Sequence, residues 1–158
     1  MVWIHYTCVM RALVQRVSEA QVRIDEIIQG RIDAGLLVFL GIGEHDVEDD
    51  LNHLAKKITQ LRIFSDTEGK MNKSVIEIGG SLLIVSQFTL FASTKKGTRP
   101  SFIKSAKPEI AIPLYDRFVE KCRRLLPVST GIFGADMKVS LVNDGPVTIW
   151  LDSKERDY

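Results

Sequence analysis

Hydrophobic and polar positions alternate in the first part of the chain, which is typical of β-strands. Residues 11–24 show a loose two-residue period, and the Asp25-Glu26 pair is placed to turn the chain into a short strand over residues 27–32. Residues 36–40 are continuously apolar between two glycines, a pattern that favours a strand buried on both faces. We therefore expect a hairpin followed by a central strand.

Two later stretches change to the helical period of about 3.6 residues. Apolar residues recur at this spacing from Asp46 to Leu61, opposite a charged face, and a second helix is expected over residues 108–126. Pro113 must lie in the first turns of that helix or kink it. The first apolar face comprises Val47, Leu51, Leu54, Ala55, Ile58 and Leu61, and the second Ala111, Leu114, Tyr115, Phe118, Cys122 and Leu125.

The remaining apolar runs are short and β-rich. Strands are expected over residues 81–85, 128–130, 137–142 and 147–151, and the last two flank a Gly145-Pro146 step. Because proline removes a ladder donor, this step should lie at a strand end or bulge, with its carbonyl groups free to face a ligand. The predicted fold is a single α/β (α+β) domain with a β-rich, barrel-like or two-sheet core and two amphipathic helices.

The composition fits a soluble globular domain of 158 residues, 45% hydrophobic and 26% charged. Its net charge of +1 means that any contact with RNA must come from a local basic patch. No apolar run is long enough to span a membrane, so no membrane partner is expected. The cysteines, Cys8 and Cys122, lack companions at metal-ligand spacing. We expect no metal or other cofactor, and a reduced cytoplasm as the compartment.

The sequence shows no familiar set of catalytic side chains: no Gly-x-Ser-x-Gly elbow, Gly-rich phosphate loop or His-Glu-x-x-His motif. His53 falls on the polar face of the first predicted helix, where a solvated role is favoured. Thr89 closes the segment Ser86-Gln87-Phe88-Thr89 and could be a nucleophile, but no neighbour in the sequence could take its proton. A threonine that satisfies backbone groups at a strand end is favoured instead. Phe88 could equally lie in the core.

Residues 94–107 hold five basic residues and no acidic one. A cradle for RNA phosphates and a solvated loop fit this charge pattern equally well. The closeness of the stretch to the Ser86–Thr89 segment favours the cradle, with Lys95, Lys96 and Arg99 as the best candidates.

Two motifs together resemble a known family. Ser86-Gln87-Phe88-Thr89 and Asn143-Asp144-Gly145-Pro146-Val147-Thr148 resemble the paired signature of the D-aminoacyl-tRNA deacylases. The resemblance runs from Met10 to about Ser153. It implies a deacylase domain over residues 10–153, with residues 1–9 as an N-terminal extension and residues 154–158 as a charged tail.

The resemblance implies an enzyme that hydrolyses the ester bond of D-aminoacyl-tRNA, and of glycyl-tRNA(Ala), in chiral proofreading. Backbone N–H groups of residues 86–89 would bind the ester carbonyl, with a terminal ribose hydroxyl of the tRNA assisting. A cis Gly145-Pro146 step, in one motif with Asn143 and held by Arg16, would exclude L side chains. In the family a partner subunit supplies this step, so the resemblance implies a homodimer with its sites at the interface. The partner would be the 3′ acceptor end of tRNA and not DNA.

Two other interpretations remain. One is an editing module like those fused to some archaeal threonyl-tRNA synthetases, which remove L-serine. The complete Gly-Pro motif and the absence of a synthetase domain argue against it. The other is a tRNA-binding or structural dimer without activity. A deacylation assay with D- and L-aminoacyl-tRNA distinguishes all three.

Overall fold

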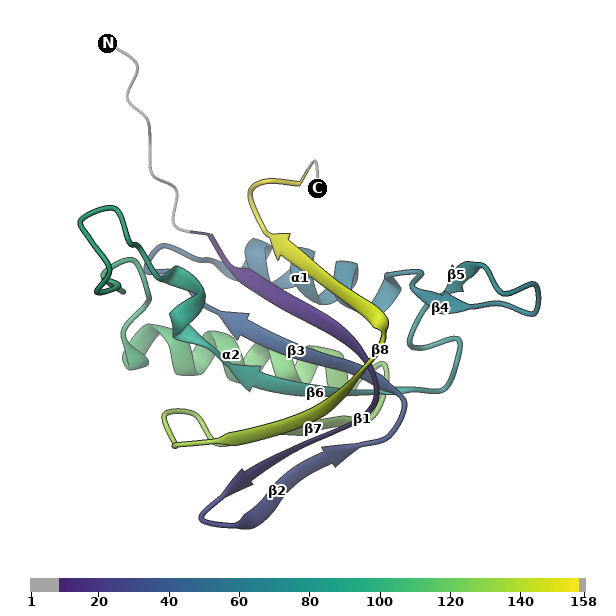
Figure 1. Ribbon diagram of the computed structural model, residues 1–158. Coiled ribbons are helices and arrows are strands. Elements are labelled where there is room, and N and C mark those ends of the chain that lie inside the picture. The colour runs from purple at the N-terminus through teal and green to yellow at the C-terminus, as the bar shows by residue number, and fades with distance from the viewer. Residues whose placement is uncertain (1–8, 157–158) are drawn as a thin grey trace.

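The computed structural model describes residues 9–156, which form a curved six-stranded sheet, a small two-stranded sheet and two helices (Figure 1). In chain order the elements are β1 (Arg11–Ile24), β2 (Ile27–Ile32), β3 (Gly35–Gly41), α1 (Glu48–Gln60), β4 (Phe64–Ser65), β5 (Met71–Lys73), β6 (Ser81–Ser86), the 3₁₀ helix η1 (Phe88–Phe91), α2 (Pro108–Arg123), β7 (Val128–Thr130) and β8 (Lys138–Asp152). The large sheet has the order β2-β1-β3-β6-β7, with β8 also paired to β1. This architecture confirms the predicted α/β class.

β1, β2 and β3 form one long antiparallel hairpin. Ala12 pairs with Leu40 and Ala20 pairs with Ile32 in the same register, so β2 and β3 act as one strand interrupted at residues 33–34. The turn residues Asp25 and Glu26 have φ angles of 48° and 65°, as a two-residue hairpin turn requires. The predicted turn and both predicted strands are therefore confirmed.

The sheet curls until β2 approaches β7. Ser129 Oγ donates a hydrogen bond of 3.1 Å to the carbonyl of Arg31, which joins the two strands. A Cβ atom at Gly30 would lie only 2.6 Å from the carbonyl oxygen of Thr130, so this close approach requires glycine. The result is a nearly closed, barrel-like sheet.

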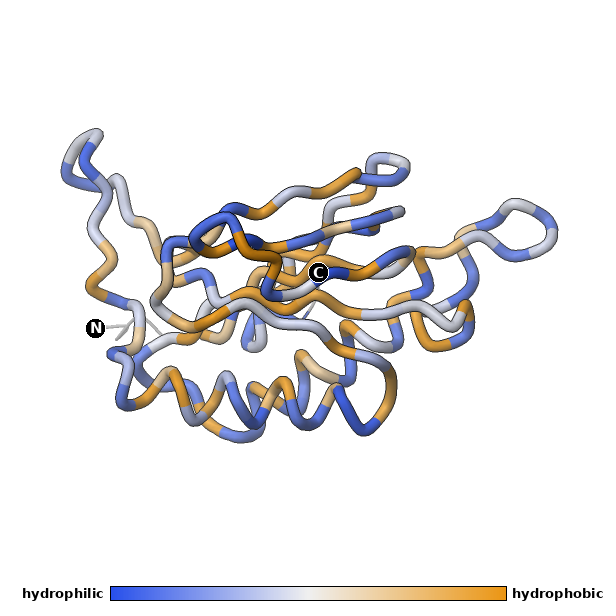
Figure 2. Tube along the Cα trace, turned by 90° about the horizontal axis from the view of Figure 1, so that it is seen from below, coloured by the Kyte–Doolittle hydropathy of each residue, from blue (hydrophilic) through white to orange (hydrophobic). Residues whose placement is uncertain are grey.

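Both faces of the central strands are buried. Val38 and Ile84 face the larger hydrophobic cluster, which the sheet shares with both helices, whereas Leu37 and Leu83 face a smaller cluster on the concave side. This two-sided burial explains the uninterrupted apolar run of β3. Figure 2 shows both helices below the sheet, with hydrophobic and hydrophilic residues alternating along them as expected for amphipathic helices.

Some predicted boundaries extend too far. α2 ends at Arg123, so Leu125 lies beyond the helix and is exposed instead of continuing its apolar face. Val47 is the N-cap of α1 and is also exposed. The two strands expected on either side of Gly145-Pro146 are a single strand, β8, with a bulge between them. No described helix is both long and apolar enough to cross a membrane.

Residues near the two ends of the described chain meet at a buried carboxylate. Asp50, in the first turn of α1, accepts hydrogen bonds from Ser153 Oγ at 2.7 Å and from the Val47 N–H at 2.9 Å, and pairs with Lys154 Nζ at 2.9 Å. Burial alone would raise the pKa of Asp50, but hydrogen bonds from Lys154, Val47 and Ser153 together lower it. Asp50 is therefore a charged anchor that neutralises Lys154.

Cys122 is buried in α2, where burial raises the pKa of its thiol to about 12. It is thus an inert core residue. The other cysteine, Cys8, and the rest of the proposed extension except Val9 lie outside the described residues.

Candidate active site

The Ser86–Thr89 segment lies where β6 ends and η1 begins. The Gln87 N–H donates a 2.8 Å hydrogen bond to the Leu40 carbonyl, which fixes the segment against the end of β3. Because Phe88 and Thr89 are the first two residues of a 3₁₀ helix, their N–H groups have no acceptor within that helix. The Phe88 side chain is 57% exposed, so the alternative that Phe88 is a core residue is wrong.

A pocket of about 250 Å³ opens beside this segment. Ser86, Gln87 and Phe88 form one wall, and the others come from the ends of β3 and β6, residues 105–106, the start of α2 and residues 133–139. The apolar lining includes Leu40, Ile42, Val85, Ala106, Ala111, Phe133, Met137 and Val139. Nothing in the sequence pattern indicates that residues 133–139 reach this site, because small and apolar residues carry no motif.

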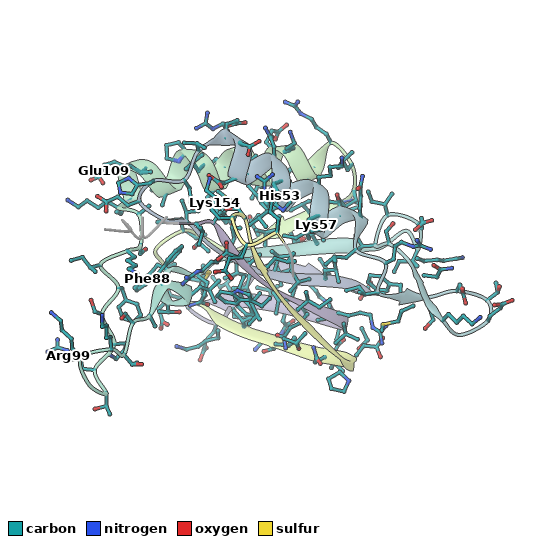
Figure 3. The ribbon with its side chains drawn as sticks, turned by 90° about the horizontal axis from the view of Figure 1, so that it is seen from above. His53, Lys57, Phe88, Arg99, Glu109 and Lys154 are labelled. Carbon is teal, nitrogen blue, oxygen red and sulfur yellow. The ribbon has the colours of Figure 1, made fainter. Side chains whose placement is uncertain are left out.

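No general base is in contact with Thr89 in the described part of the chain. Its hydroxyl accepts a hydrogen bond from the Gln87 side-chain amide, which cannot take a proton. Figure 3 shows His53 on α1, well away from Phe88. The arrangement offers main-chain N–H groups beside a pocket and no paired nucleophile and base.

The Gly145-Pro146 step lies in a wide bulge of β8. Gln15 pairs with Thr148 and Val17 pairs with Asn143, so residues 144–147 have no partner in the β1 register. The Gly145-Pro146 peptide is cis, and Gly145 has a φ angle of 132°. Both residues are exposed. The prediction that proline falls at a bulge is confirmed.

Hydrogen bonds from the side chains of Arg16 and Asn143 hold this bulge in place. Arg16 Nε donates to the Asp144 carbonyl at 3.0 Å and Arg16 Nη1 donates to the Ile63 carbonyl at 2.5 Å. Asn143 Nδ2 donates to the Val147 carbonyl at 3.2 Å and so spans the bulge. Arg16 therefore holds the carbonyl that precedes Gly145 and ties the bulge to the segment after α1.

Within one chain, the bulge lies away from the Ser86–Thr89 segment along the strands. Arg11 pairs with Gly41, at the end of β3 where the pocket opens, whereas Arg16 pairs with Leu36 near its start. Five strand residues at about 3.3 Å each separate these positions by roughly 17 Å. Gly145 and Pro146 do not line the pocket of their own chain.

The basic residues 94–107 form a loop that projects beyond the sheet (Figure 1), with Arg99 far out on it (Figure 3). Ser93 and Ser101 pair through backbone hydrogen bonds of 2.8 and 2.9 Å at the base of the loop. Phe102 packs edge-on against Phe88, with ring centroids 5.1 Å apart. The loop is therefore connected directly to the Ser86–Thr89 segment. Lys95, Lys96 and Arg99 are exposed and form no ion pair with the described residues.

Arg11 is a supporting residue that the sequence does not reveal. Its Nη1 donates to the Leu90 carbonyl at 3.0 Å, and its guanidinium lies over the Phe91 ring, 4.9 Å from the centroid. Nε lies 3.7 Å from an Asp152 carboxylate oxygen. Arg11 thus fixes η1 to β1 and β8, and with it the segment that opens the pocket.

Across residues 9–156, no group of three or more His, Cys, Asp and Glu side chains is placed to hold a metal ion.

Comparison with known proteins assigns the family. The model of the D-Tyr-tRNA(Tyr) deacylase family matches residues 13–152. The chain is 56% identical over 150 residues to a D-aminoacyl-tRNA deacylase of Parabacteroides distasonis, across 94% of this chain and 100% of the relative.

Two solved structures share the fold. One, described as c-Myc DNA Unwinding Element Binding Protein, has a TM-score of 0.85 and 40% identity, and the match covers 89% of this chain and 97% of the other. A probable eukaryotic D-amino acid tRNA deacylase, at 20% identity, has a TM-score of 0.79 over 91% of this chain and 99% of the other, and it supports the fold alone. By the family match and the close bacterial relative, this chain belongs to the D-aminoacyl-tRNA deacylase family of hydrolases.

Proposed function

We propose that this protein hydrolyses the ester bond of D-aminoacyl-tRNA, and of glycyl-tRNA(Ala), and spares L-aminoacyl-tRNA. The observation that carries this proposal is the pocket beside Ser86–Thr89, which presents main-chain N–H groups without a nucleophile and base pair. Such a pocket suits a reaction in which the substrate supplies part of the chemistry.

In the proposed reaction, the N–H groups of Phe88 and Thr89 bind the ester carbonyl oxygen and stabilise the negative charge that develops on it. Water adds to the carbonyl carbon, the bond to the ribose oxygen breaks, and that oxygen takes up a proton. The neighbouring ribose hydroxyl assists, which restricts the reaction to RNA ends. Ser86 and Gln87 shape the pocket and keep the segment against β3.

We assign chiral selection to Gly145 and Pro146 of a partner subunit. The exposed bulge lies roughly 17 Å along β1 from the pocket end of β3 in its own chain, as a group lent to another copy would. In that position, main-chain atoms would leave no room for an L side chain, whereas a D side chain points away. Glycine has no side chain to exclude, so glycyl-tRNA(Ala) is a substrate too.

A symmetric homodimer follows from this assignment, because each pocket then needs the other chain's bulge. Apolar side chains that are exposed at separate points along β2 and β8 offer surface that such a dimer would cover. They are Ile27, Ile28, Val142 and Trp150, which are 43–63% exposed.

Lys95, Lys96 and Arg99 would hold the phosphates near the 3′ end of the tRNA. The Phe88–Phe102 contact supports this role, because it places the base of the basic loop beside the pocket. Phosphate contacts require positive charge but no base recognition, as suits an enzyme that acts on a terminus common to all tRNAs.

The direct test is a deacylation assay with D-tyrosyl-tRNA, L-tyrosyl-tRNA and glycyl-tRNA(Ala), with released amino acid measured over time. We expect hydrolysis of the first and third and none of the second above the spontaneous rate. Cleavage of L-seryl-tRNA would indicate an editing module for L-serine, and binding without cleavage an inactive tRNA-binding protein.

Thr89→Ala is expected to retain activity within about threefold of the wild type, because no described group could take a proton from the Thr89 hydroxyl. The measurement is kcat on D-tyrosyl-tRNA. Gln87→Ala is a useful companion, since it removes the other partner of the same hydrogen bond. Complete loss of activity in a folded Thr89→Ala protein would instead support a covalent mechanism.

A further inference from the structure

A second cationic surface lies on α1, apart from the basic loop. His53, Lys56, Lys57, Gln60, Leu61 and Arg62 surround an open depression of about 450 Å³. Lys56, Lys57 and Arg62 are exposed. Figure 3 shows His53 and Lys57 together on the helix, on a part of the molecule distant from Arg99. We call this surface, defined by His53, Lys56, Lys57 and Arg62, the α1 patch.

The two lysines of the α1 patch have no acidic partner at ion-pair distance. The acids in the first turn of α1 already have partners: Asp49 pairs with Arg156 and Asp50 pairs with Lys154, each at 2.9 Å. Neither Lys56 nor Lys57 forms an ion pair within residues 9–156. A concave surface lined by one sign of charge concentrates the field and attracts the opposite charge.

Arg62 is held in position at the rim. Its Nε donates to the Asn72 carbonyl at 3.0 Å, and its Nη2 contacts the Asn72 side chain. Neither hydrogen-bond partner is charged, although hydrogen bonds from Ser74 and, after them, the charge of Arg62 lower the pKa of the nearby Glu77 carboxyl. Burial lowers the pKa of His53, and the nearby charges of Arg156 and Lys57 lower it further, while Asp49 and Asp50 act in the opposite direction.

The α1 patch lies close to the Gly145-Pro146 bulge. Arg62 directly precedes Ile63, whose carbonyl accepts the 2.5 Å hydrogen bond from Arg16, and Arg16 also holds the bulge through Asp144. The patch and the bulge thus share one support. Figure 1 shows α1 running from the end of β3 where the pocket opens toward β4, so its last turns lie away from the pocket of their own chain.

We infer that the α1 patch binds backbone phosphates of the tRNA whose 3′ end occupies the partner subunit's pocket. This inference rests on the proposed function, in which the bulge of one subunit enters the pocket of the other. The α1 patch beside the bulge would then lie next to that pocket. Each tRNA is then held by the basic loop of one chain and by the α1 patch of the other. The ligand is an RNA backbone because the surface offers several cations without a pattern of groups for reading bases.

The test compares two D-tyrosyl esters, one of intact tRNA and one of adenosine, which lacks the phosphates. The double variant Lys56→Gln/Lys57→Gln should have a KM for the tRNA ester that is roughly tenfold higher at about 0.1 M salt. The slope of log KM against the logarithm of the salt concentration should also become shallower, by about 1.5. The KM and kcat for the adenosine ester should stay unchanged, which also shows that the variant is folded.

Lys70→Gln/Lys73→Gln is the matched control, since it removes the same charge from lysines that already face acids. Lys70 pairs with Glu68 at 3.4 Å. Backbone hydrogen bonds are the main cause of the lowered pKa values of Asp66 and Glu77, and the charge of Lys73 adds to both shifts. An equal rise of KM in this control would show a net-charge effect and overturn the inference. So would an unchanged KM in the α1 variant. If the wild type cleaved neither ester, the proposed function itself would be wrong and the inference would fail with it.

Mixed dimers test which chain provides the patch. The Lys56→Gln/Lys57→Gln chain is combined with an Ala135→Trp chain, whose pocket is filled and whose homodimer should be inactive on both esters. In this mixed dimer the open pocket belongs to the Lys56→Gln/Lys57→Gln chain. The intact α1 patch belongs to the Ala135→Trp chain. A KM for the tRNA ester near the wild-type value supports the inference, and a KM as high as in the double-variant homodimer overturns it.

Discussion

Gly145→Val is expected to lower the turnover of D-tyrosyl-tRNA about a hundredfold. The φ angle of 132° at Gly145 is one that L residues rarely adopt, and a Cβ there would lie 2.9 Å from both Arg16 Nη2 and Val147 Cγ2 and 3.1 Å from the Val147 backbone nitrogen. Backbone strain of about 1–3 kcal/mol in this region would displace the bulge. A shift of an ångström in a positioning group is enough for a loss of this size.

Gly69→Val is the matched control for Gly145→Val. Gly69 also has a positive φ, of 77°, but nothing lies within 4 Å of the Cβ position, and it occupies the turn between β4 and β5. This variant carries backbone strain without touching the proposed filter, so its activity should match the wild type. If Gly145→Val kept full activity while remaining folded, the Gly145-Pro146 step would have no role in the site.

Arg16→Met should reduce turnover of D-tyrosyl-tRNA by roughly thirtyfold and allow measurable cleavage of L-tyrosyl-tRNA. The substitution removes the hydrogen bonds to the carbonyls of Asp144 and Ile63 while keeping an apolar stem of similar length. Hydrogen bonds from a charged donor contribute about 1.5–3 kcal/mol each. Without them the bulge is held less rigidly, so exclusion of the L side chain weakens.

The readout for Arg16→Met is the ratio of D to L hydrolysis, which a purely structural loss would not change. Arg117→Met serves for comparison, because Arg117 makes an exposed ion pair of 3.4 Å with Glu48 and lies on α2. Its activity and its D to L ratio should equal those of the wild type. A folded Arg16→Met enzyme with an unaltered ratio would exclude Arg16 from chiral selection.

Local features of the sequence predicted most of the secondary structure. The strong two-residue and 3.6-residue periods identified the strands and both helices, because each element buries one face or both against the same core. The bulge at Pro146 was also predictable, since proline cannot donate to a ladder. The short elements β4, β5 and η1 were missed, because two to four residues show too little of a period, although the three-residue β7 was expected.

The candidate site was predictable only in part. The motif identified Ser86–Thr89 and the Gly145-Pro146 step, but it could not show that they lie apart within one chain, since this depends on strand register. Residues 133–139 and Arg11 reach the pocket or its support through the fold and have no local signature. The role of Arg16 was more specific than expected: it binds the carbonyls of Asp144 and Ile63 and so joins the bulge to the segment that follows α1.

If a partner subunit's bulge excludes L side chains, as proposed above, the fidelity of the enzyme depends on protein concentration. A lone subunit would keep a folded pocket without the group that excludes L side chains, so dilution below the dimer dissociation constant would leave a less selective or idle enzyme. A cell could then adjust chiral checking through the amount of protein it makes, with the strongest response near the midpoint of dimer formation.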